Sequence, residues 1–405
     1  MSTLSERLQL LGIQIGAKNF PRPQTAKTTY PLSAVLNVST HTTIFGEAQY
    51  IHKTYAANYQ HGIVNLSAPI FGQMLASWGQ AVSSNLSRQK ILFLDTETSG
   101  LSGGSGTFAF LIGLGYWNDA EFELTQFFLP HPESENSFLT AFDEFVSNFN
   151  CLVTFNGKSF DVPLINSRHT LNRLQPPFPK AEHLDLLHLA RRLWRYRLTD
   201  RSLTSLEENI LHLSRTQEDI PGWMIPQLYL DYLQTQDARP LVNIFYHNEM
   251  DILSLAALFL YLGDLLEHPL QQPIQPHGLD WMAIARLYED TDHLEQAMTL
   301  YRASLNAGLP MSFYLDTCRR FAKIYRQQRD WPNAIALWQT AAENGDPLSC
   351  IELAKYYEHQ VGDLDQALSW TNQAIQQTKF SDPELTKRLN RLKQKISGKT
   401  TVFKE

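Results

Sequence analysis

Residues 91–98 read Ile-Leu-Phe-Leu-Asp-Thr-Glu-Thr, a short apolar run that leads into two acids, Asp95 and Glu97. The apolar run predicts a buried strand, and side chains at positions i and i+2 of a strand point to the same face. We therefore expect two carboxylates side by side at the end of a rigid element, where repulsion would normally keep one protonated. A hard divalent cation removes that conflict by binding both groups. The alternative is an ordinary strand end with two solvated acids.

Two later segments carry further acids in similar settings. Asp161 comes after a second apolar strand, residues 151–155, and lies just past a strand end, where open α/β sheets bind ligands. Asp251 opens an apolar helical run, and His247 lies one turn earlier on the same helix face. A pair of Mg²⁺ or Mn²⁺ ions held by carboxylates activates a water and stabilises the leaving oxygen of a phosphodiester. The sequence thus predicts two divalent ions and four carboxylate ligands: Asp95, Glu97, Asp161 and Asp251.

These three segments, in this order, resemble the exonuclease motifs of the DEDD superfamily, which has an RNase H-like fold. The stretches 96–107, 183–186, 220–226 and 247–251 are similar to the YprB-like branch of that superfamily, and the likeness is most specific over residues 89–265. YprB-like proteins are generally described as predicted exonucleases, often with tetratricopeptide repeats behind the catalytic domain. The resemblance implies a metal-dependent 3′-5′ exonuclease that hydrolyses single-stranded DNA or RNA.

The third motif departs from the superfamily pattern, which is usually Tyr-x-x-x-Asp or His-x-x-x-x-Asp. Here the spacings are exchanged, because His247 precedes Asp251 by four residues and Tyr246 precedes it by five. A helical offset of four turns a side chain only about 40° from Asp251, whereas an offset of five turns it about 140°. We therefore expect His247 to orient or deprotonate the attacking water. Two alternatives remain: Tyr246 curls inward if the helix starts at Asn248, or the histidine only forms a hydrogen bond to Asp251 or the backbone.

Contacts to the substrate are expected beside the acids. Thr98, Gly100 and Asn156 are the candidates next to the metal ligands. The glycine-rich segment 100–106 lacks the Lys-Ser/Thr pair of a nucleoside-triphosphate loop, and a strand follows it where a helix should start. It is therefore a connection between strands, which either holds a terminal nucleotide or forms a plain turn.

Positive charge gathers in one local stretch, although the whole chain has a formal net charge of −7. Five arginines lie within residues 191–201, and phosphate contacts require such local charge. Arg191 and Arg195 are the candidates for contacts to distal phosphates. The alternative is a solvated helix face whose arginine stems cover apolar surface.

The composition describes an ordinary soluble protein. The chain has 405 residues, of which 43% are hydrophobic, and three cysteines without the spacing of a zinc site. This argues against a disulfide framework and favours a reducing compartment. The N-terminal residues lack the apolar core of a signal peptide, and no apolar run reaches the length of a membrane span. We expect a cytoplasmic protein with no membrane partner.

The expected fold class is α/β: an RNase H-like mixed sheet with flanking helices, followed by an all-α array. Three strands in a meander are followed by alternating helices and strands. The strands are expected near residues 91–94, 108–117, 121–129, 152–155 and 184–187, and the first helices over 134–149 and 162–171. The predicted domain order is an N-terminal region of mixed strands and loops (1–88), the exonuclease domain (89–267), a proline-rich linker (268–278) and tetratricopeptide-like repeats (279–396).

The C-terminal third contains an internal repeat. Similar blocks begin at Ala285, Ala322 and Ala354, which are 37 and 32 residues apart and bracket the tetratricopeptide length. Such arrays bind peptides or partner proteins on a concave face, although the block can also be purely structural. Two functions therefore compete: a metal-dependent exonuclease, and a nuclease-like scaffold that is weak or inactive in catalysis and binds nucleic acid and protein partners.

Overall fold

A computed structural model describes residues 30–79, 87–100, 106–179, 181–216, 219–274, 276–378 and 382–402. Residues 1–29 of the expected N-terminal region lie outside the described residues, as does most of the glycine-rich segment 100–106. Within the described parts, no helix combines the length and the apolar character needed to cross a membrane.

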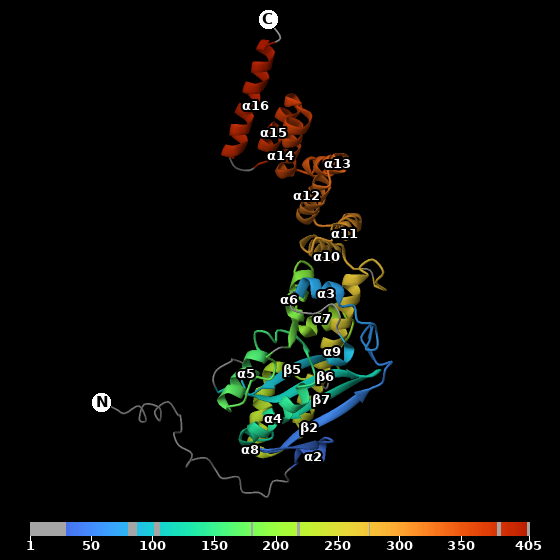
Figure 1. Ribbon diagram of the computed structural model, residues 1–405, viewed down its shortest axis with the longest axis vertical. Helices are drawn as coiled ribbons and strands as arrows, with labels where there is room; N and C mark the ends of the chain where they lie inside the picture. Colours follow the sequence, from blue (N-terminus) through green and yellow to red (C-terminus); the bar gives the residue numbers. More distant parts are fainter. Residues whose placement is uncertain are drawn as a thin grey trace, which may run out of the picture.

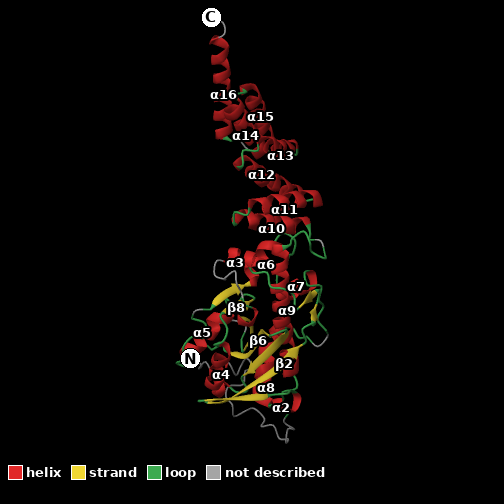
Figure 2. Cartoon of the chain, turned by 45° about the vertical axis from the view of Figure 1, so that its right-hand side comes forward, coloured by secondary structure: helices red, strands yellow, loops and turns green. Residues whose placement is uncertain are grey.

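The fold is built on a mixed seven-stranded sheet with the strand order β1-β2-β7-β6-β5-β8-β9 (Figures 1 and 2). Pairing is antiparallel from β1 to β5 and parallel from β5 through β8 to β9. The strands are β1 (Ser39–Thr43), β2 (Gly46–Tyr55), β5 (Ile91–Thr98), β6 (Ala109–Asn118), β7 (Glu121–Phe128), β8 (Cys151–Thr154) and β9 (Glu182–Asp185). The mixed α/β architecture expected from the sequence is therefore present.

The sheet differs from expectation at both edges. Strands β1 and β2 come from the expected N-terminal region of mixed strands and loops, and β2 pairs along β7 and extends the same sheet. A small two-stranded sheet, β3 (Gln60–His61) with β4 (Val64–Asn65), follows them. At the other edge β9 ends at Asp185, earlier than the expected 184–187, because the Asp185 carboxylate caps a helix by accepting the Leu187 N–H.

Helices cover both faces of the sheet. One face packs against α3 (Gln73–Gly79), α6 (Leu186–Trp194), α7 (Leu203–Asn209) and the C-terminal part of α9 (Leu241–Glu267). The other packs against α4 (Glu135–Val146), α5 (Asp161–Leu171) and α8 (Ile225–Thr235), with a four-residue helix, α2 (Leu32–Val35), at its edge. Three short 3-10 helices, Arg88–Lys90, Pro132–Ser134 and Gly222–Met224 (η4), complete this part.

The alternation of β5 decides where its acids lie. Ile91 and Phe93 belong to the core on the α9 side, whereas Leu92 and Leu94 belong to the core on the α4 side. Side chains two residues apart share a face. Asp95 therefore continues the row that faces α9, and Glu97 follows it in the same row.

Beyond the sheet, helices stack into an elongated array that rises away from it (Figure 1). The helices pack in sequential pairs, α10 with α11, α12 with α13 and α14 with α15, and α16 lies against α15. Their bounds are α10 (Gly278–Asp290), α11 (Leu294–Ala307), α12 (Met311–Gln327), α13 (Trp331–Glu343), α14 (Pro347–Tyr356), α15 (Leu364–Gln377) and α16 (Pro383–Val402), with a π-helical turn at Tyr357–Val361. The last helix runs to Val402, past the end expected near Ile396.

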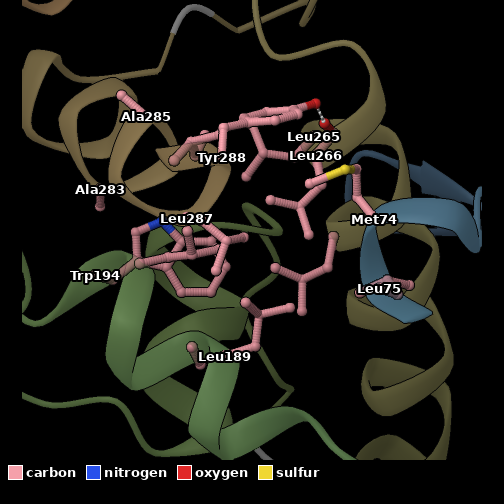
Figure 3. Packing of buried hydrophobic residues seen from close by; sticks show 14 of the residues in the cluster. Met74, Leu75, Leu189, Trp194, Leu265, Leu266, Ala283, Ala285, Leu287 and Tyr288 are labelled. Atoms are coloured by element: carbon pink, nitrogen blue, oxygen red, sulfur yellow. Dashed lines mark hydrogen bonds between the residues drawn. The ribbon is translucent and has the colours of Figure 1, made fainter. Parts of the chain in front are cut away.

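The array is joined to the sheet domain by a shared core. Figure 3 shows Leu287 and Tyr288 of α10 beside Trp194 of α6 and the Leu265–Leu266 end of α9. The Tyr288 hydroxyl donates a hydrogen bond to the carbonyl of Leu266. Leu287 and Trp194 are fully buried. The apolar core thus continues across the segment 268–278, which the sequence analysis treats as a linker.

Candidate metal centre

Four acids from three elements converge at the carboxyl end of β5. Asp95 and Glu97 come from β5, Asp161 from the first position of α5, and Asp251 from α9. Each of the two β5 carboxylates interacts electrostatically with both Asp161 and Asp251. The structure therefore brings together the four residues that the sequence singles out as metal ligands.

His247 lies in the tightest part of this cluster. Ligand atoms of Glu97, His247 and Asp251 all lie within 4.8 Å of one another. The His247 Nε2 is 3.4 Å from Oδ2 of Asp251, one helical turn away, and its Nδ1 is 2.6 Å from Oδ1 of Asp219. The short second contact favours the proton on Nδ1, which leaves the Nε2 lone pair directed towards the carboxylates.

The second candidate for assisting the water, Tyr246, has a different environment. Its hydroxyl accepts a hydrogen bond of 2.9 Å from Thr216. Helix α9 already begins at Leu241, so both Tyr246 and His247 have helical backbone. The four-residue offset between His247 and Asp251 is therefore a helical one, and the histidine shares the side of the helix on which Asp251 lies.

Two neighbours hold the remaining acids in place. Thr96 donates a hydrogen bond to Oδ1 of Asp161, and Asn248 Nδ2 donates one of 2.9 Å to Oδ2 of Asp95. Asn248 is completely buried and accepts a bond of 2.9 Å from Gln126. A Cβ on Gly113, the β6 partner of Asp95, would lie 2.1 Å from the Asn248 side chain, so only glycine leaves room for this contact.

The acids carry more negative charge than their surroundings offset. Burial, followed by repulsion from Asp251 and Asp161, raises the pKa of Asp95 well above its ordinary value. Burial and the same neighbours raise the pKa of Glu97 well above its range. Burial also raises the pKa of Asp161 to about 6, against the hydrogen bond from Thr96. Without a cation the cluster therefore binds protons more tightly than isolated carboxylates do.

One cation of the chain itself touches this cluster. Arg215 donates to Oδ1 of Asp251 and forms a paired contact with Glu207, at 2.6 Å from Nε and 2.5 Å from Nη2. Burial alone would lower the pKa of Arg215, but Glu207 and Asp251 outweigh it and raise the pKa. Sequence reasoning missed Arg215, Glu207 and Asp219, because each is brought to the site by a loop or helix that carries no recognisable spacing to the acids.

The turn after β8 is held by Asp185, which lies in the family-like stretch 183–186 but was not among the predicted site residues. Asp185 accepts hydrogen bonds from the backbone N–H groups of Asn156, at 2.8 Å, and Lys158, at 3.0 Å. Asn156 has a left-handed backbone with φ of 68°, and its side chain is exposed. Asp185 therefore fixes the turn that leads into Asp161, while the Asn156 side chain stays available.

The other predicted substrate contacts lie in different settings. Thr98 is buried, and its hydroxyl donates a 2.8 Å hydrogen bond to the carbonyl of Gly100, so it shapes the start of the glycine-rich connection. Arg191 and Arg195 have exposed side chains on and just after α6. They line a separate cavity, together with arginines of the helix array, and not the acid cluster itself.

The donor set suits a hard divalent cation. Carboxylate oxygens are ligands that both Mg²⁺ and Mn²⁺ accept, so the four acids can hold a cation while the His247 Nε2 stays free. The His247 Nε2 lies 3.4 Å from the Asp251 Oδ2, an arrangement that a proton between them stabilises. Repulsion among the acids points to the same need.

Comparisons with known proteins identify the family of the chain. Residues 92–262 match the family model RNase_H_2 of the RNase_H superfamily. The chain is 32% identical over 365 residues to the uncharacterized protein YprB of Bacillus subtilis (strain 168), and the match covers 85% of each chain. A family B DNA polymerase from the archaeon Pyrobaculum calidifontis matches 61% of this chain and 30% of its own at 12% identity, with a TM-score of 0.36.

Proposed function

Because the chain belongs to the family of Bacillus subtilis YprB and carries an RNase H superfamily domain, we propose that it is a metal-dependent nuclease. Its site acts as a 3′-5′ exonuclease of the DEDD type on single-stranded DNA or RNA. The observation that supports the proposal is that Asp95, Glu97, Asp161 and Asp251 come together at the carboxyl end of β5, with pKa values that are raised chiefly by burial.

Each residue of the site has a distinct role in this proposal. Asp95, Glu97, Asp161 and Asp251 hold the cations; the set matches two Mg²⁺ or Mn²⁺ ions. When bound, the ions lower the pKa of the attacking water and neutralise charge that develops on the phosphodiester. Asn248 and Thr96 keep two of the carboxylates in fixed rotamers. Fixed ligands reduce the reorganisation required during the reaction.

His247 receives the proton of the attacking water at Nε2. Asp219 holds the opposite ring nitrogen at 2.6 Å and stabilises the imidazolium that forms. A carboxylate behind a histidine fixes its tautomer and raises its basicity in many hydrolases. Asp219 is therefore a positioning residue in this proposal, and Tyr246 is held away by Thr216.

The substrate end is received beside His247. A cavity of about 440 Å³ is lined there by Arg215, Asp219, Gly222 and His247. Trp223, which follows Gly222 on η4, is 69% exposed. An exposed aromatic ring offers a stacking surface for a base, worth about 1–3 kcal/mol per base. The exposed Asn156 side chain is a polar contact in this proposal.

One observation favours the competing function, a nuclease-like scaffold. Arg215 already occupies Oδ1 of Asp251 and is almost fully buried, with 6% of its side chain exposed. A guanidinium in that position competes with a cation for the same oxygen. If it does not move when cations are present, the site binds nucleic acid weakly and turns over slowly.

The test is hydrolysis of labelled oligonucleotides by the full-length protein. Single-stranded DNA and RNA, each labelled at either end, are incubated with Mg²⁺, Mn²⁺ or EDTA. A 3′-5′ exonuclease shortens 5′-labelled strands in single-nucleotide steps, releases the 3′ label at once and leaves a circular strand intact. Cleavage of the circle would identify an endonuclease, and absence of cleavage with either metal would favour the scaffold.

A further inference from the structure

A second polar site lies at the junction between the sheet domain and the helix array. A cavity of about 640 Å³ opens where α6 and the turn after it meet α10 and α12. Among the described residues that line it, Asp290 alone is acidic. Six arginines line it: Arg191, Arg192, Arg195, Arg201, Arg286 and Arg320.

These arginines are only partly neutralised. Arg192 forms an ion pair with Asp290. Arg286 donates to Asp316 at 2.6 Å, and Arg320 contacts Asp316 and Glu289 at 3.2 Å each. Arg191, Arg195 and Arg201 form no ion pair with any residue in the described parts of the chain. Crowding is visible in Arg192, whose pKa is lowered by burial and by Arg195 and Arg320.

The positions of the guanidinium groups are set by aromatic contacts. Arg195 lies over the ring of Tyr196 with its Cζ 4.4 Å from the centroid, and Arg286 lies 5.4 Å from the same ring. Both donate to the Tyr196 hydroxyl. The Nε atoms of Arg201 and Arg286 are buried and have no hydrogen-bond partner among the described residues. An acceptor-rich anion can pair with the exposed guanidinium groups of Arg191 and Arg195.

The junction cavity is connected to the catalytic end of the molecule. A second cavity of about 410 Å³ shares Arg191 and Arg201 with it and reaches Asn156. Asn156 begins the turn that leads into Asp161, one of the four acids of the metal centre. A polyanion that leaves the metal centre past Asn156 therefore meets Arg201 and Arg191 before it reaches the arginines of the array.

We propose, on the premise that the protein acts on nucleic acid, that the junction cavity binds phosphates of the single-stranded substrate several nucleotides from the bond that is cut. The helix array is then part of the nucleic-acid interface, through Arg286 of α10 and Arg320 of α12. This resolves the conflict between a net charge of −7 and a polyanionic substrate, because the positive charge is concentrated on one path.

A matched pair of arginines on α12 tests the proposal. Arg320 lines the cavity, whereas Arg326 does not; each is ion-paired, and their side chains are 38% and 41% exposed. Arg320→Gln and Arg326→Gln therefore remove the same charge from the same helix. Binding of a fluorescent 20-nucleotide strand and a tetranucleotide is measured by anisotropy in EDTA, with the full-length protein, over a range of salt concentrations.

The expected result is a several-fold loss of affinity for the 20-nucleotide strand in Arg320→Gln only. The slope of log affinity against log salt should fall by about 0.7 for each lost phosphate contact. A double variant, Arg191→Ala with Arg195→Ala, should lower the slope further. Binding of the tetranucleotide should be unaffected by Arg320→Gln. The proposal would be overturned if Arg320→Gln and Arg326→Gln lost the same affinity for the 20-nucleotide strand. It would also be overturned if Arg320→Gln weakened binding of the tetranucleotide.

A further arm separates the polymer from a free anion. If inorganic phosphate or a mononucleotide binds with the same dependence on Arg320, and the 20-nucleotide strand shows none, the cavity is a small-molecule site and the proposal is wrong. The assay requires no hydrolysis. If the protein hydrolyses nothing but Arg320→Gln still weakens binding of the 20-nucleotide strand, the proposed nuclease function is wrong and this inference stands. If the protein is an active nuclease but Arg320→Gln binds normally, the nuclease function stands and this inference is wrong.

Discussion

The metal centre and the junction cavity differ in how their charges are stabilised. At the metal centre, burial and then mutual repulsion raise the pKa values of Asp95 and Glu97, and Arg215 offsets part of this effect. At the junction, an aromatic ring and partial ion pairs hold the guanidinium groups of the arginines in place. The first site therefore depends on small cations that bind tightly, whereas the second suits a flexible polyanion that makes many weak contacts.

Among changes at the two sites, we expect the largest effect on activity from a substitution of Asp95 in the metal centre. Asp95→Asn should reduce single-turnover hydrolysis by roughly 10³-fold or more, because it removes a charged ligand of the cations that would stabilise the transition state. The same change should raise the melting temperature of the metal-free protein, because it removes repulsion from Asp161 and Asp251. The matched control is Glu121→Gln, an exposed acid on β7. Undiminished activity in Asp95→Asn would refute the metal centre.

We expect the next largest effect, on stability, from a substitution in the core that the sheet domain shares with the helix array. Leu287→Ala removes a fully buried side chain between α10 and α6, and we expect a loss of about 2–5 kcal/mol in the free energy of unfolding. Leu348→Ala, at a leucine of the array that is 53% exposed, is the control and should cost far less. Denaturant unfolding measures both. If the two leucines cost the same, the array is coupled to the sheet domain less tightly than its packing indicates.

The third largest effect is expected from substitution of His247, the proposed general base. His247→Ala should lower the rate about 10²-fold, within the usual range for loss of a general base, and Tyr246→Phe should change it less than about threefold. Rates are measured with Mn²⁺ at saturating substrate. The reverse order, with the larger loss in the tyrosine variant, would assign the water-orienting role to Tyr246.

The smallest effect concerns pH. The pKa of Asp161 is raised to about 6 without a cation, so bound cations must displace protons below that value. Mn²⁺ affinity should fall by about tenfold per pH unit for each displaced proton as the pH drops below 6. Calorimetric titration with Mn²⁺ between pH 5 and 8 checks this, and a pH-independent affinity would contradict it.

The sign of the stability effect follows from the same shift. The folded state binds protons more tightly than the unfolded chain, whose Asp pKa is near 4. Stability of the metal-free protein is therefore greatest at the low end of the window from about 4 to 6 and declines as the pH rises through it. Oligonucleotide binding at the junction should change less over the same range, because the six arginines of the cavity stay charged.

Sequence patterns captured the elements that depend on short-range periodicity. The alternation in residues 91–98 placed Asp95 and Glu97 on one face, and β5 keeps that arrangement. The four-residue offset put His247 and Asp251 on one side of a helix, as α9 has them. The repeated blocks after residue 279 predicted paired helices, and the structure shows the pairs.

The tertiary structure alone decided the features that depend on contacts between distant segments. Strand β2 joins the sheet through β7, although 65 residues or more of chain separate the two strands. Arg215 meets Asp251, and Asn248 meets Asp95, across loops whose lengths carry no periodic signal.

The same is true of the junction cavity, which gathers arginines from α6, α10 and α12. Local sequence determines the conformation and the inward face of each element, because side-chain direction repeats with the backbone. Which charged groups meet depends on how those faces pack, and packing minimises exposed apolar area over the whole chain. The sequence by itself therefore determined on which strand or helix each candidate metal ligand lies. Only the packed structure decided which side chains surround those ligands.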